Sequence, residues 1–416
     1  MANACGVDFG TSNSTVGWVR PGQPSLLALE DGKSTLPSVV FFNADEDAVR
    51  YGRAALADYL EGYDGRLMRS LKSLLGTSLM DGQTEVAGRA LPFKQLLGHF
   101  IGELKRRAEQ QAGREFPSAV FGRPVYFIDD DPTADRLAED TLAEIARSVG
   151  FRDIGFQYEP IAAAFDYESR IEREELVLIA DIGGGTSDFS LLRLGPDRAG
   201  RVERRDDILA TGGVHLGGTD FDKYLSLAAV MPLLGYGSTL LSGAAVPNSY
   251  YFNLATWHTI NQAYTRKSAA QLDELVRDAA EPAKLKRLRG LIEDRAGHWL
   301  AMQVEAAKIG LSDTPEVTID LDRLSPPELL RVGRSAFTDA IGGLTDDIGA
   351  TVQRLLVDAG VAPERVDTVF FTGGSSGVGA LRERIAAIVP DARRVEGDLF
   401  GSIGAGLALD AARKFS

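Results

Sequence analysis

The chain has 416 residues, of which 44% are hydrophobic and 25% are charged, and its formal net charge is −14. This length and composition are typical of a globular protein with two or three domains. The negative charge argues against nucleic acid and anionic membrane as main partners, because both bind proteins through basic surfaces. The sequence opens without a basic segment followed by an apolar one, and no stretch of about 20 residues is apolar throughout. We therefore expect a soluble, cytoplasmic protein.

Cysteine and histidine usage predicts neither a disulfide framework nor a metal cage. Cys5 is the single cysteine and lies in an apolar stretch, so we expect it to be a small buried side chain. The four histidines lack the spacing of metal ligands: His99, His215, His258 and His298. The acidic composition is still compatible with a phosphate ligand, because the electrostatic potential at a local site can be opposite in sign to the average over the molecule.

The first half of the chain opens with three short β-like runs, ACGVDF, STVGWV and, after Pro37, SVVFF. A helical section follows through about residue 112, and the apolar run SAVFGRPVYFI then predicts a buried strand. The segment TADRLAEDTLAEIARSVG has apolar residues near a 3.6-residue period, which predicts a helix with Thr133 as N-cap and Gly150 as stop signal. A short strand near DIGFQY and a helix at EPIAAAFDYESRIEREE complete this half.

The second half begins again with β-like runs, ELVLIADI, DFSLLRL and RVERRDDILAT. A mainly helical stretch covers roughly 220–310, with irregular pieces at 232–253, before the strand EVTIDL and a helix that reaches LLVDAG. The strand DTVFFT, the helix ALRERIAAIV and a last helix from about Gly401 follow. Each half thus has three antiparallel-looking strands and then strand–helix alternation, which indicates parallel strands with crossover helices. We expect two similar α/β lobes with a ligand between them.

Two similar segments mark the starts of the halves: VDFGTSNST at 7–15 and ADIGGGTSD at 180–188. The second continues into the strand-like FSLLRL, and no Gly-Lys-Ser/Thr motif is present, so neither is a Walker loop. Both are predicted to be tight hairpins whose glycine tips let backbone N–H groups approach the β- and γ-phosphates of a nucleotide. Asp8 and Asp181 would repel those phosphates unless a divalent cation lay between them, and Mg²⁺ with its waters suits that geometry.

A third segment, FFTGGSSGVGALRERI, reads as a strand, a glycine–serine loop and a helix. The loop amides and the helix N-terminus can hold the sugar and phosphates of a nucleotide. Such a loop alone is weak evidence for nucleotide binding. It is stronger evidence here because it follows the two predicted phosphate-binding hairpins along the chain.

These motifs, together with KSLLG, GRPVYF, YEPIAAAF, HLGGTDFD, EAAKIGLS and GDLFGSIGAGLAL, resemble the nucleotide-binding domain of DnaK-type (heat-shock-protein-70) chaperones. The resemblance covers nearly the whole chain, and FRDIGFQYEPIAAAFDYE is especially similar to the short YegD-type members. It implies the actin-like ATPase architecture, a duplicated ribonuclease H-like α/β fold with two lobes around a nucleotide cleft. Lobe I would comprise residues 1–174 and the C-terminal helix 396–416. Lobe II would comprise 175–395, with an inserted helical subdomain at about 226–308.

The resemblance also implies roles for individual residues. Asp8 and Asp181 would hold Mg²⁺ through water, with Glu159 behind them. Lys72 would neutralise charge on the γ-phosphate and position the attacking water, while Thr186 and Asp188 would orient that water or the waters of the metal. The implied catalytic residues are Lys72, Asp8, Glu159, Asp181 and Thr186. The implied nucleotide contacts are Gly10, Thr11, Ser12, Asn13, Gly183, Gly184, Gly185, Thr186, Gly217, Gly218, Glu305, Lys308, Ser312, Gly373, Gly374, Ser375 and Asp398.

The chain departs from the family pattern in three places. The two arginines that sandwich adenine in the family are replaced by Ile309 and Gly377, although an isoleucine can still pack on one face of the ring. Stacking of arginine on a base contributes about 1–3 kcal/mol, so adenine binding should be weaker. The sequence stops at Ser416, so we expect no peptide-binding domain in cis. The segment 226–300, with YYFNLATWHTIN, matches poorly and is expected to be local core packing of an inserted subdomain.

The resemblance implies an ATP hydrolase of low activity that uses ATP/ADP and Mg²⁺ and acts as a nucleotide-driven, chaperone-like switch. Its expected partners are a nucleotide and, in trans, a client or co-chaperone protein. Two alternatives share the same superfold and remain open: a small-molecule kinase, and a filament-forming or scaffold protein.

Overall fold

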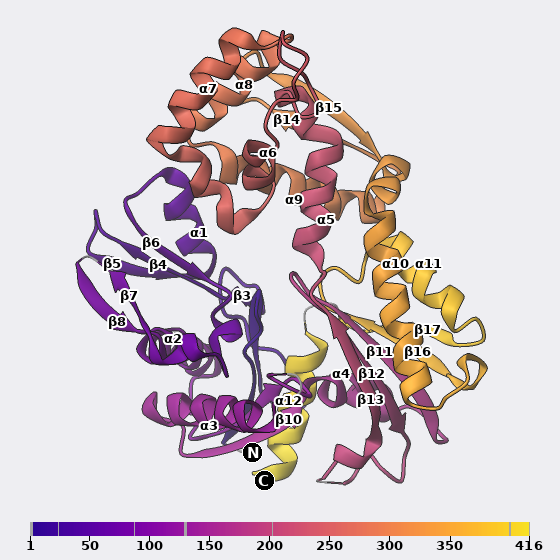
Figure 1. Cartoon of the computed structure of the whole chain (residues 1–416). Helices are drawn as coiled ribbons and strands as arrows, with labels where there is room; N and C mark the ends of the chain where they lie inside the picture. Colours follow the sequence, from indigo (N-terminus) through magenta and orange to yellow (C-terminus); the bar gives the residue numbers. More distant parts are fainter. Residues whose placement is uncertain are drawn as a thin grey trace.

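The computed structural model describes residues 3–23, 25–86, 88–128, 131–201, 203–398 and 401–415. Two sheets of five strands each lie at the centres of two lobes, the first coloured indigo to purple and the second magenta to orange (Figure 1). Within these residues, no helix combines the length and the apolar character needed to cross a bilayer.

The sheet of the first lobe has the five strands in the order β10 (Asp153–Tyr158), β9 (Ser118–Arg123), β1 (Ala4–Asp8), β2 (Asn13–Gly17) and β3 (Thr35–Pro37). Strand β1 runs antiparallel to β2 and parallel to β9. All five residues of β1 are buried because helices cover both faces of the sheet. Cys5 is among them, as the apolar stretch predicted.

The sheet of the second lobe repeats this arrangement with β13 (Ile208–Val214), β12 (Ser187–Leu194), β11 (Glu175–Ile182), β16 (Thr368–Thr372) and β17 (Arg393–Glu396). Strand β11 is antiparallel to β12 and parallel to β16, as β1 is to β2 and β9. The expected duplication of an α/β lobe is therefore confirmed. Asp8 and Asp181 lie at equivalent places, opposite Thr15 and Asp188 on the neighbouring strands.

The remaining strands of the first lobe form two small sheets, and its helices connect them. The elements are β4 (Val39–Asn43), β5 (Ala48–Tyr51), α1 (Gly52–Glu61), β6 (Gly65–Arg69), β7 (Gln83–Val86), β8 (Arg89–Pro92), α2 (Phe93–Ala112), α3 (Pro132–Ser148) and α4 (Glu159–Glu168). The run SVVFF was expected as the third strand of the main sheet, but it forms β4 of the separate β5–β4–β6 sheet. The Ser38 N–H donates to the Ser12 carbonyl at 2.9 Å, which extends the β2–β3 pairing by one residue, and β4 then pairs with β5 and β6 instead.

The section up to about residue 112 was expected to be helical, but it also contains the strands β5 to β8. Three predicted boundaries were wrong as well. Helix α3 begins at Pro132, and its N-cap is Asp131, whose carboxylate accepts the N–H groups of Thr133 and Ala134; Thr133 is not the cap. Proline suits the first helical position because its missing N–H would have no partner there. Helix α4 ends at Glu168, well before the end of the predicted segment. Strand β13 begins only at Ile208, since the three preceding residues form a 3₁₀ turn.

Helices make up most of the second lobe outside its sheet. They and one hairpin are α5 (Gly218–Leu225), α6 (Ser249–Leu254), α7 (Arg266–Asp278), α8 (Pro282–Glu293), α9 (Gly297–Asp313), β14 (Glu316–Leu321), β15 (Glu328–Gly333), α10 (Arg334–Asp358) and α11 (Gly379–Ile388). The chain then continues into α12 (Ser402–Lys414), which belongs with the first lobe. Tyr250 and Tyr251 are buried with the other apolar residues of this lobe. Their burial agrees with the expected core packing of the aromatic segment.

Helix α12, drawn in yellow, returns from the second lobe and packs on β1, β9 and α4 (Figure 1). Its contact with α4 is backbone to backbone. A Cβ atom on Gly406 would lie only 1.9 Å from the carbonyl oxygen of Ala162. Glycine is therefore required at this crossing, and the last helix of the chain completes the first lobe.

The lobes also touch through an interlobe aromatic contact, formed by Tyr59, Arg69, Trp257 and His298. The Tyr59 and His298 rings lie 5.0 Å apart edge to face, and the His298 and Trp257 rings lie 4.8 Å apart. The Arg69 guanidinium lies 4.4 Å from the centre of the Trp257 ring. Burial, together with the charge of Arg69, lowers the pKa of His298 to about 4.

The close crossing of α4 and α12 predicts the effect of one added methyl group. Gly406→Ala should lower the free energy of unfolding by about 1–3 kcal/mol, because the two backbones must move apart. Gly343→Ala is the matched control: Gly343 lies inside α10 with no atom near its missing Cβ. That change should raise stability by about 0.5–1 kcal/mol through helix propensity. Urea unfolding measures both, and equal effects of the two changes would contradict the prediction.

The buried His298 predicts a pH dependence of stability. Its pKa is about 4 in the folded protein and near 6.5 when exposed, so the unfolded chain binds more protons between these values. The free energy of unfolding should therefore fall as the pH decreases from about 6.5 to about 4, by at most about 3 kcal/mol. His298→Phe keeps a ring at this place but cannot titrate. Unfolding curves for the two proteins should converge above pH 7 and separate in acid; parallel pH profiles would be the contrary result.

Candidate functional site

Two glycine tips face each other across the lobes: the first glycine tip, residues 9–12, follows β1, and the second glycine tip, residues 183–186, follows β11. A hydrogen bond from the Gly183 N–H to the Thr186 carbonyl, 2.9 Å long, closes the second tip. A Cβ atom on Gly184 would lie 2.5 Å from the Ser12 hydroxyl oxygen. The tips therefore approach more closely than side chains would allow.

Three predicted segments of the second lobe are joined by backbone hydrogen bonds. The Gly218 N–H donates to Gly183 at 3.0 Å, and the Thr219 N–H donates to Gly184 at 2.7 Å. The Ser375 N–H donates to the Ile182 carbonyl at 2.9 Å. The second tip, the HLGG segment and the GGSS loop therefore form one continuous surface.

Gly373 at the start of the GGSS loop can only be glycine. Its φ is +81°, and a Cβ atom there would lie 2.4 Å from a carboxylate oxygen of Asp181. A side chain would therefore be strained and would displace Asp181. This loop is built against the strand end that carries the carboxylate.

Four charged side chains converge below the tips: Asp8, Asp181, Glu159 at the start of α4, and Lys72. The Lys72 ammonium donates to a carboxylate oxygen of Glu159. Burial raises the pKa of Asp8 to about 7, and repulsion by Glu159 adds to the effect. Burial likewise raises the pKa of Asp181 to about 8, with repulsion from Asp188, Glu159 and Asp8.

The backbone before Lys72 turns sharply. Ser70 has a left-handed conformation, with φ of +55°, which is uncommon for a residue with a side chain. It leads from β6 into the 3₁₀ turn Leu71–Leu74, which carries Lys72. Burial lowers the pKa of Lys72, but the charges of Glu159 and Asp8 outweigh this and hold it above its usual value. Lys72 is therefore positively charged at neutral pH.

The donor set fits a magnesium ion held through water. All candidate ligands are carboxylates, which is the ligand type that Mg²⁺ prefers, and the acids outnumber the one lysine. Across the described ranges, no three His, Cys, Asp or Glu side chains are grouped closely enough to bind a metal directly.

The predicted nucleoside contacts lie mainly on α9. The Lys308 ammonium donates to the Gly218 carbonyl at 3.2 Å and to Asp222 at 3.0 Å, so it is tied to the HLGG segment beside the second tip. A Cβ atom on Gly377 would lie 3.8 Å from the Ser312 hydroxyl, which places the GGSS loop beside α9. Ile309 is 58% exposed, although it is apolar. Glu305 is exposed one turn before Lys308.

Asp398 lies between β17 and α12. The N–H of the preceding Gly397 donates at 3.0 Å to the carbonyl of Phe371, two residues before the GGSS loop begins at Gly373. The Asp398 carbonyl accepts the N–H and the hydroxyl of Ser402. Leu399 and Phe400, which belong to the same predicted motif, lie outside the described residues. A hollow of about 660 Å³ between α2 and α3, lined among others by Tyr51 and His99, contains none of the predicted nucleotide contacts.

Two residues of this region were missed from the sequence. The Ser38 hydroxyl donates to the Gly10 carbonyl at 2.6 Å and so supports the first glycine tip from behind. Arg69, three residues before Lys72, stacks on Trp257 and lies in the field of Glu305. Arg69 stands beside a recognisable motif, whereas no local pattern distinguishes Ser38 from other serines.

Comparisons with known proteins agree with this geometry. A family model described as "Hsp70 protein" matches residues 4–230 and 272–408. The chain is 28% identical over 429 aligned positions to the chaperone protein HscA of Citrobacter koseri. That alignment covers 98% of this chain and 58% of HscA, so the chain spans little more than half the length of this relative. The residues left unmatched between these two parts are 231–271. This stretch is shorter than the segment 226–300, which we expected to match the family poorly.

The raised pKa values of Asp8 and Asp181 predict proton release on binding. Both carboxyls are partly protonated near neutral pH, and a magnesium nucleotide should favour their charged forms. MgADP should therefore bind more tightly as the pH increases from about 7 to about 8.5, by at most about tenfold per proton and pH unit. Calorimetry in two buffers of different ionisation enthalpy counts the protons.

The matched variant for this prediction is Asp181→Asn, which should release fewer protons and bind MgADP more weakly. An affinity that does not change with pH, or equal proton release by both proteins, would be inconsistent with the assigned carboxyls.

Proposed function

The chain belongs to the Hsp70 family, and on that basis we propose that it binds ATP with Mg²⁺ and hydrolyses it slowly, as a nucleotide-driven switch. The observation that carries the proposal is the meeting of Asp8, Asp181, Glu159 and Lys72 below two glycine tips. This arrangement has an oxygen donor set for magnesium, one buried cation and backbone amides for phosphate. These are the parts that phosphoryl transfer requires.

Each group would have a separate task. Magnesium, when bound through water to Asp8 and Asp181, would neutralise charge on the phosphates. Glu159 holds the Lys72 ammonium, which would stabilise the charge that develops on the γ-phosphate and would position the attacking water. The Thr186 hydroxyl, which donates to Asp188 at 2.8 Å, would orient that water.

ATP is the proposed nucleotide, and α9 would bind its nucleoside. Lys308, Ser312 and Glu305 lie on this helix, and Gly377 lies beside Ser312. The exposed Ile309 offers an apolar surface on which a purine ring can pack. Its weaker stacking favours a lower affinity for adenine than two arginines would give.

We infer that the chain is divided into two lobes that each contribute to the proposed nucleotide site. Lobe I would be 1–174 with 396–416, and lobe II would be 175–395 with a helical insertion at about 226–308. The packing of α12 on β1 and the position of α6 to α9 above the second sheet support these limits (Figure 1). Nucleotide-dependent opening of the lobes would be read by a client or co-chaperone bound in trans.

Lys72→Ala should separate hydrolysis from binding. ATP turnover should fall by about 100-fold or more, because the charge near the γ-phosphate is lost. MgADP has no γ-phosphate, so its dissociation constant should change much less. Lys94→Ala is the matched control, since Lys94 is a partly exposed lysine of α2 that pairs with Glu144.

Phosphate release from ATP is measured without any added acceptor, which also distinguishes an ATPase from a small-molecule kinase. Full turnover by Lys72→Ala would refute the assigned role. Sedimentation with and without MgATP tests the filament alternative, which predicts a nucleotide-dependent pellet.

A further inference from the structure

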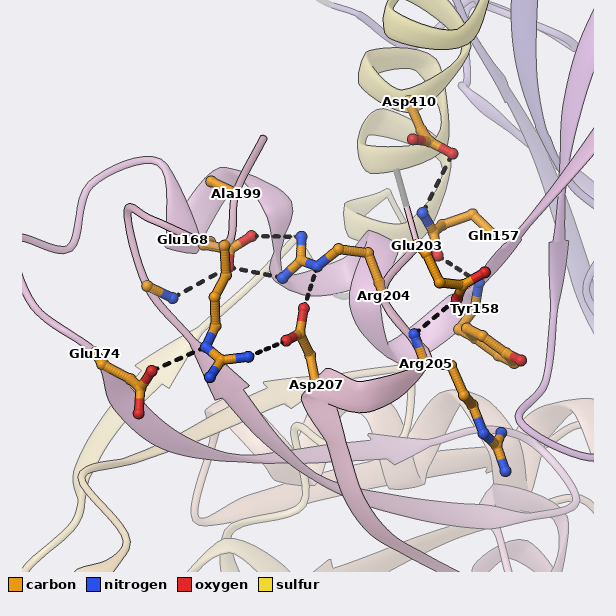
Figure 2. A network of polar contacts seen from close by, with 12 residues as sticks. Gln157, Tyr158, Glu168, Glu174, Ala199, Glu203, Arg204, Arg205, Asp207 and Asp410 are labelled. Atoms are coloured by element: carbon orange, nitrogen blue, oxygen red, sulfur yellow. Dashed lines mark hydrogen bonds and ion pairs between the residues drawn. The ribbon is translucent and has the colours of Figure 1, made fainter. Parts of the chain in front are cut away.

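A buried ion cluster includes Glu168, the last residue of α4 (Figure 2). The other end of this helix carries Glu159. The Arg204 side chain is 0% exposed, and its two terminal nitrogens donate to the two carboxylate oxygens of Glu168 at 2.9 and 2.8 Å. Its Nε donates to Asp207. We call these residues, with Arg198, the Arg204 cluster. They connect α4 to the second-lobe loop that carries Arg198, Arg204 and Asp207.

The charges of the Arg204 cluster balance. Arg198 donates to Asp207 at 2.5 Å and to Glu174 at 2.9 Å, and the Gly195 N–H donates to Glu168 at 3.1 Å. Moving charged groups out of water is costly, and apolar residues of similar volume often give equal stability. Stability alone therefore does not account for this arrangement. A two-pronged arginine–carboxylate pair does fix both distance and direction, which apolar packing does not.

The same loop contacts the other end of α4. The Arg205 side chain donates to the Tyr126 hydroxyl at 2.8 Å, and its guanidinium lies 5.5 Å from the centre of the Tyr158 ring. Tyr158 directly precedes Glu159. The loop also contacts α12, because the Arg413 side chain of that helix donates to the Ala199 carbonyl at 2.8 Å. The adjacent residues Arg204 and Arg205 therefore hold α4 near both of its ends.

Helix α4 is short and carries a residue of the nucleotide site. Glu159 is its first residue and is bonded to Lys72, and Glu168 is its last. At about 1.5 Å per residue, the two glutamates lie roughly 14 Å apart along the helix axis. A helix of ten residues moves as a unit, so a displacement at Glu168 is transmitted to Glu159.

We propose that Arg204 is a positioning residue: through Glu168 and Asp207 it fixes α4 so that Glu159 holds Lys72 in place for hydrolysis. Arg204 itself does not reach the nucleotide. The inference rests on the proposed ATPase function, but the orientation of α4 can be tested without nucleotide.

The test uses the whole chain and two variants of the Arg204 cluster. Glu168→Gln keeps the shape but loses the charge, and Arg204→Lys keeps the charge but loses the two-pronged geometry. Glu30→Gln is the matched control. The Glu30 side chain is also nearly buried, at 7% exposed, and accepts from Arg53 at 3.1 Å, but it lies in the first lobe and is not bonded to α4.

Three measurements are made on each protein: ATP turnover with MgATP, the dissociation constant of MgADP, and hydrogen–deuterium exchange without nucleotide. Both cluster variants should lower kcat by about tenfold while changing the MgADP constant by less than about twofold. Exchange should increase along the whole of α4 and in the turn at residues 71–74. Glu30→Gln should leave kcat and both segments unchanged, whatever it does to the melting temperature.

The possible outcomes separate the two claims. If the parent protein hydrolyses no ATP, the proposed function fails, and the exchange of α4 still decides the role of Arg204. If exchange increases only around Glu168, or if kcat falls equally in Glu30→Gln, Arg204 does not position the site. If Glu168→Gln does not fold, Arg204→Lys carries the same comparison, because it retains the charge balance.

Discussion

The contact between the two glycine tips is the constraint on which the nucleotide site depends. Because Gly184 lies against the Ser12 hydroxyl, a side chain at residue 184 would collide with the first tip, and glycine there lets the two tips approach. The same approach brings the charge of Asp8 close enough to Asp181 to raise its pKa. The lobes thus form a negatively charged site whose rim is proposed to bind phosphate, and such a site is complete only when the lobes are together.

Two helices connect that site to contacts elsewhere between the lobes. Helix α9 carries His298 of the interlobe aromatic contact at one end and Lys308 near the other. Helix α4 carries Glu159 at its start and Glu168 at its end, where the Arg204 cluster holds it. Helices are rigid over these lengths, and protein cores are close-packed. A movement of one lobe relative to the other should therefore displace both Glu159 and Lys308, which lie on opposite sides of the proposed nucleotide site.

The duplicated fold and the carboxylates at Asp8 and Asp181 could be predicted because both follow from local patterns that occur twice. The partners of the buried charged side chains could not be predicted from the sequence. Lys72 became a site residue only through resemblance, since Glu159 stands 87 positions away, and Arg204 lay in a predicted strand because its partner Glu168 is 36 positions distant. The cap of α3 failed for a local reason: Asp131 and Thr133 flank Pro132, and both residue types can cap.

The return of α12 to the first lobe has a consequence for synthesis on the ribosome. Strand β1 emerges first, yet the helix that covers one of its faces is made almost 400 residues later, after the whole second lobe. Until then an apolar strip of the nascent first sheet stays open to misassociation. The first lobe can therefore reach its final packing only after the second lobe and α12 have been synthesised.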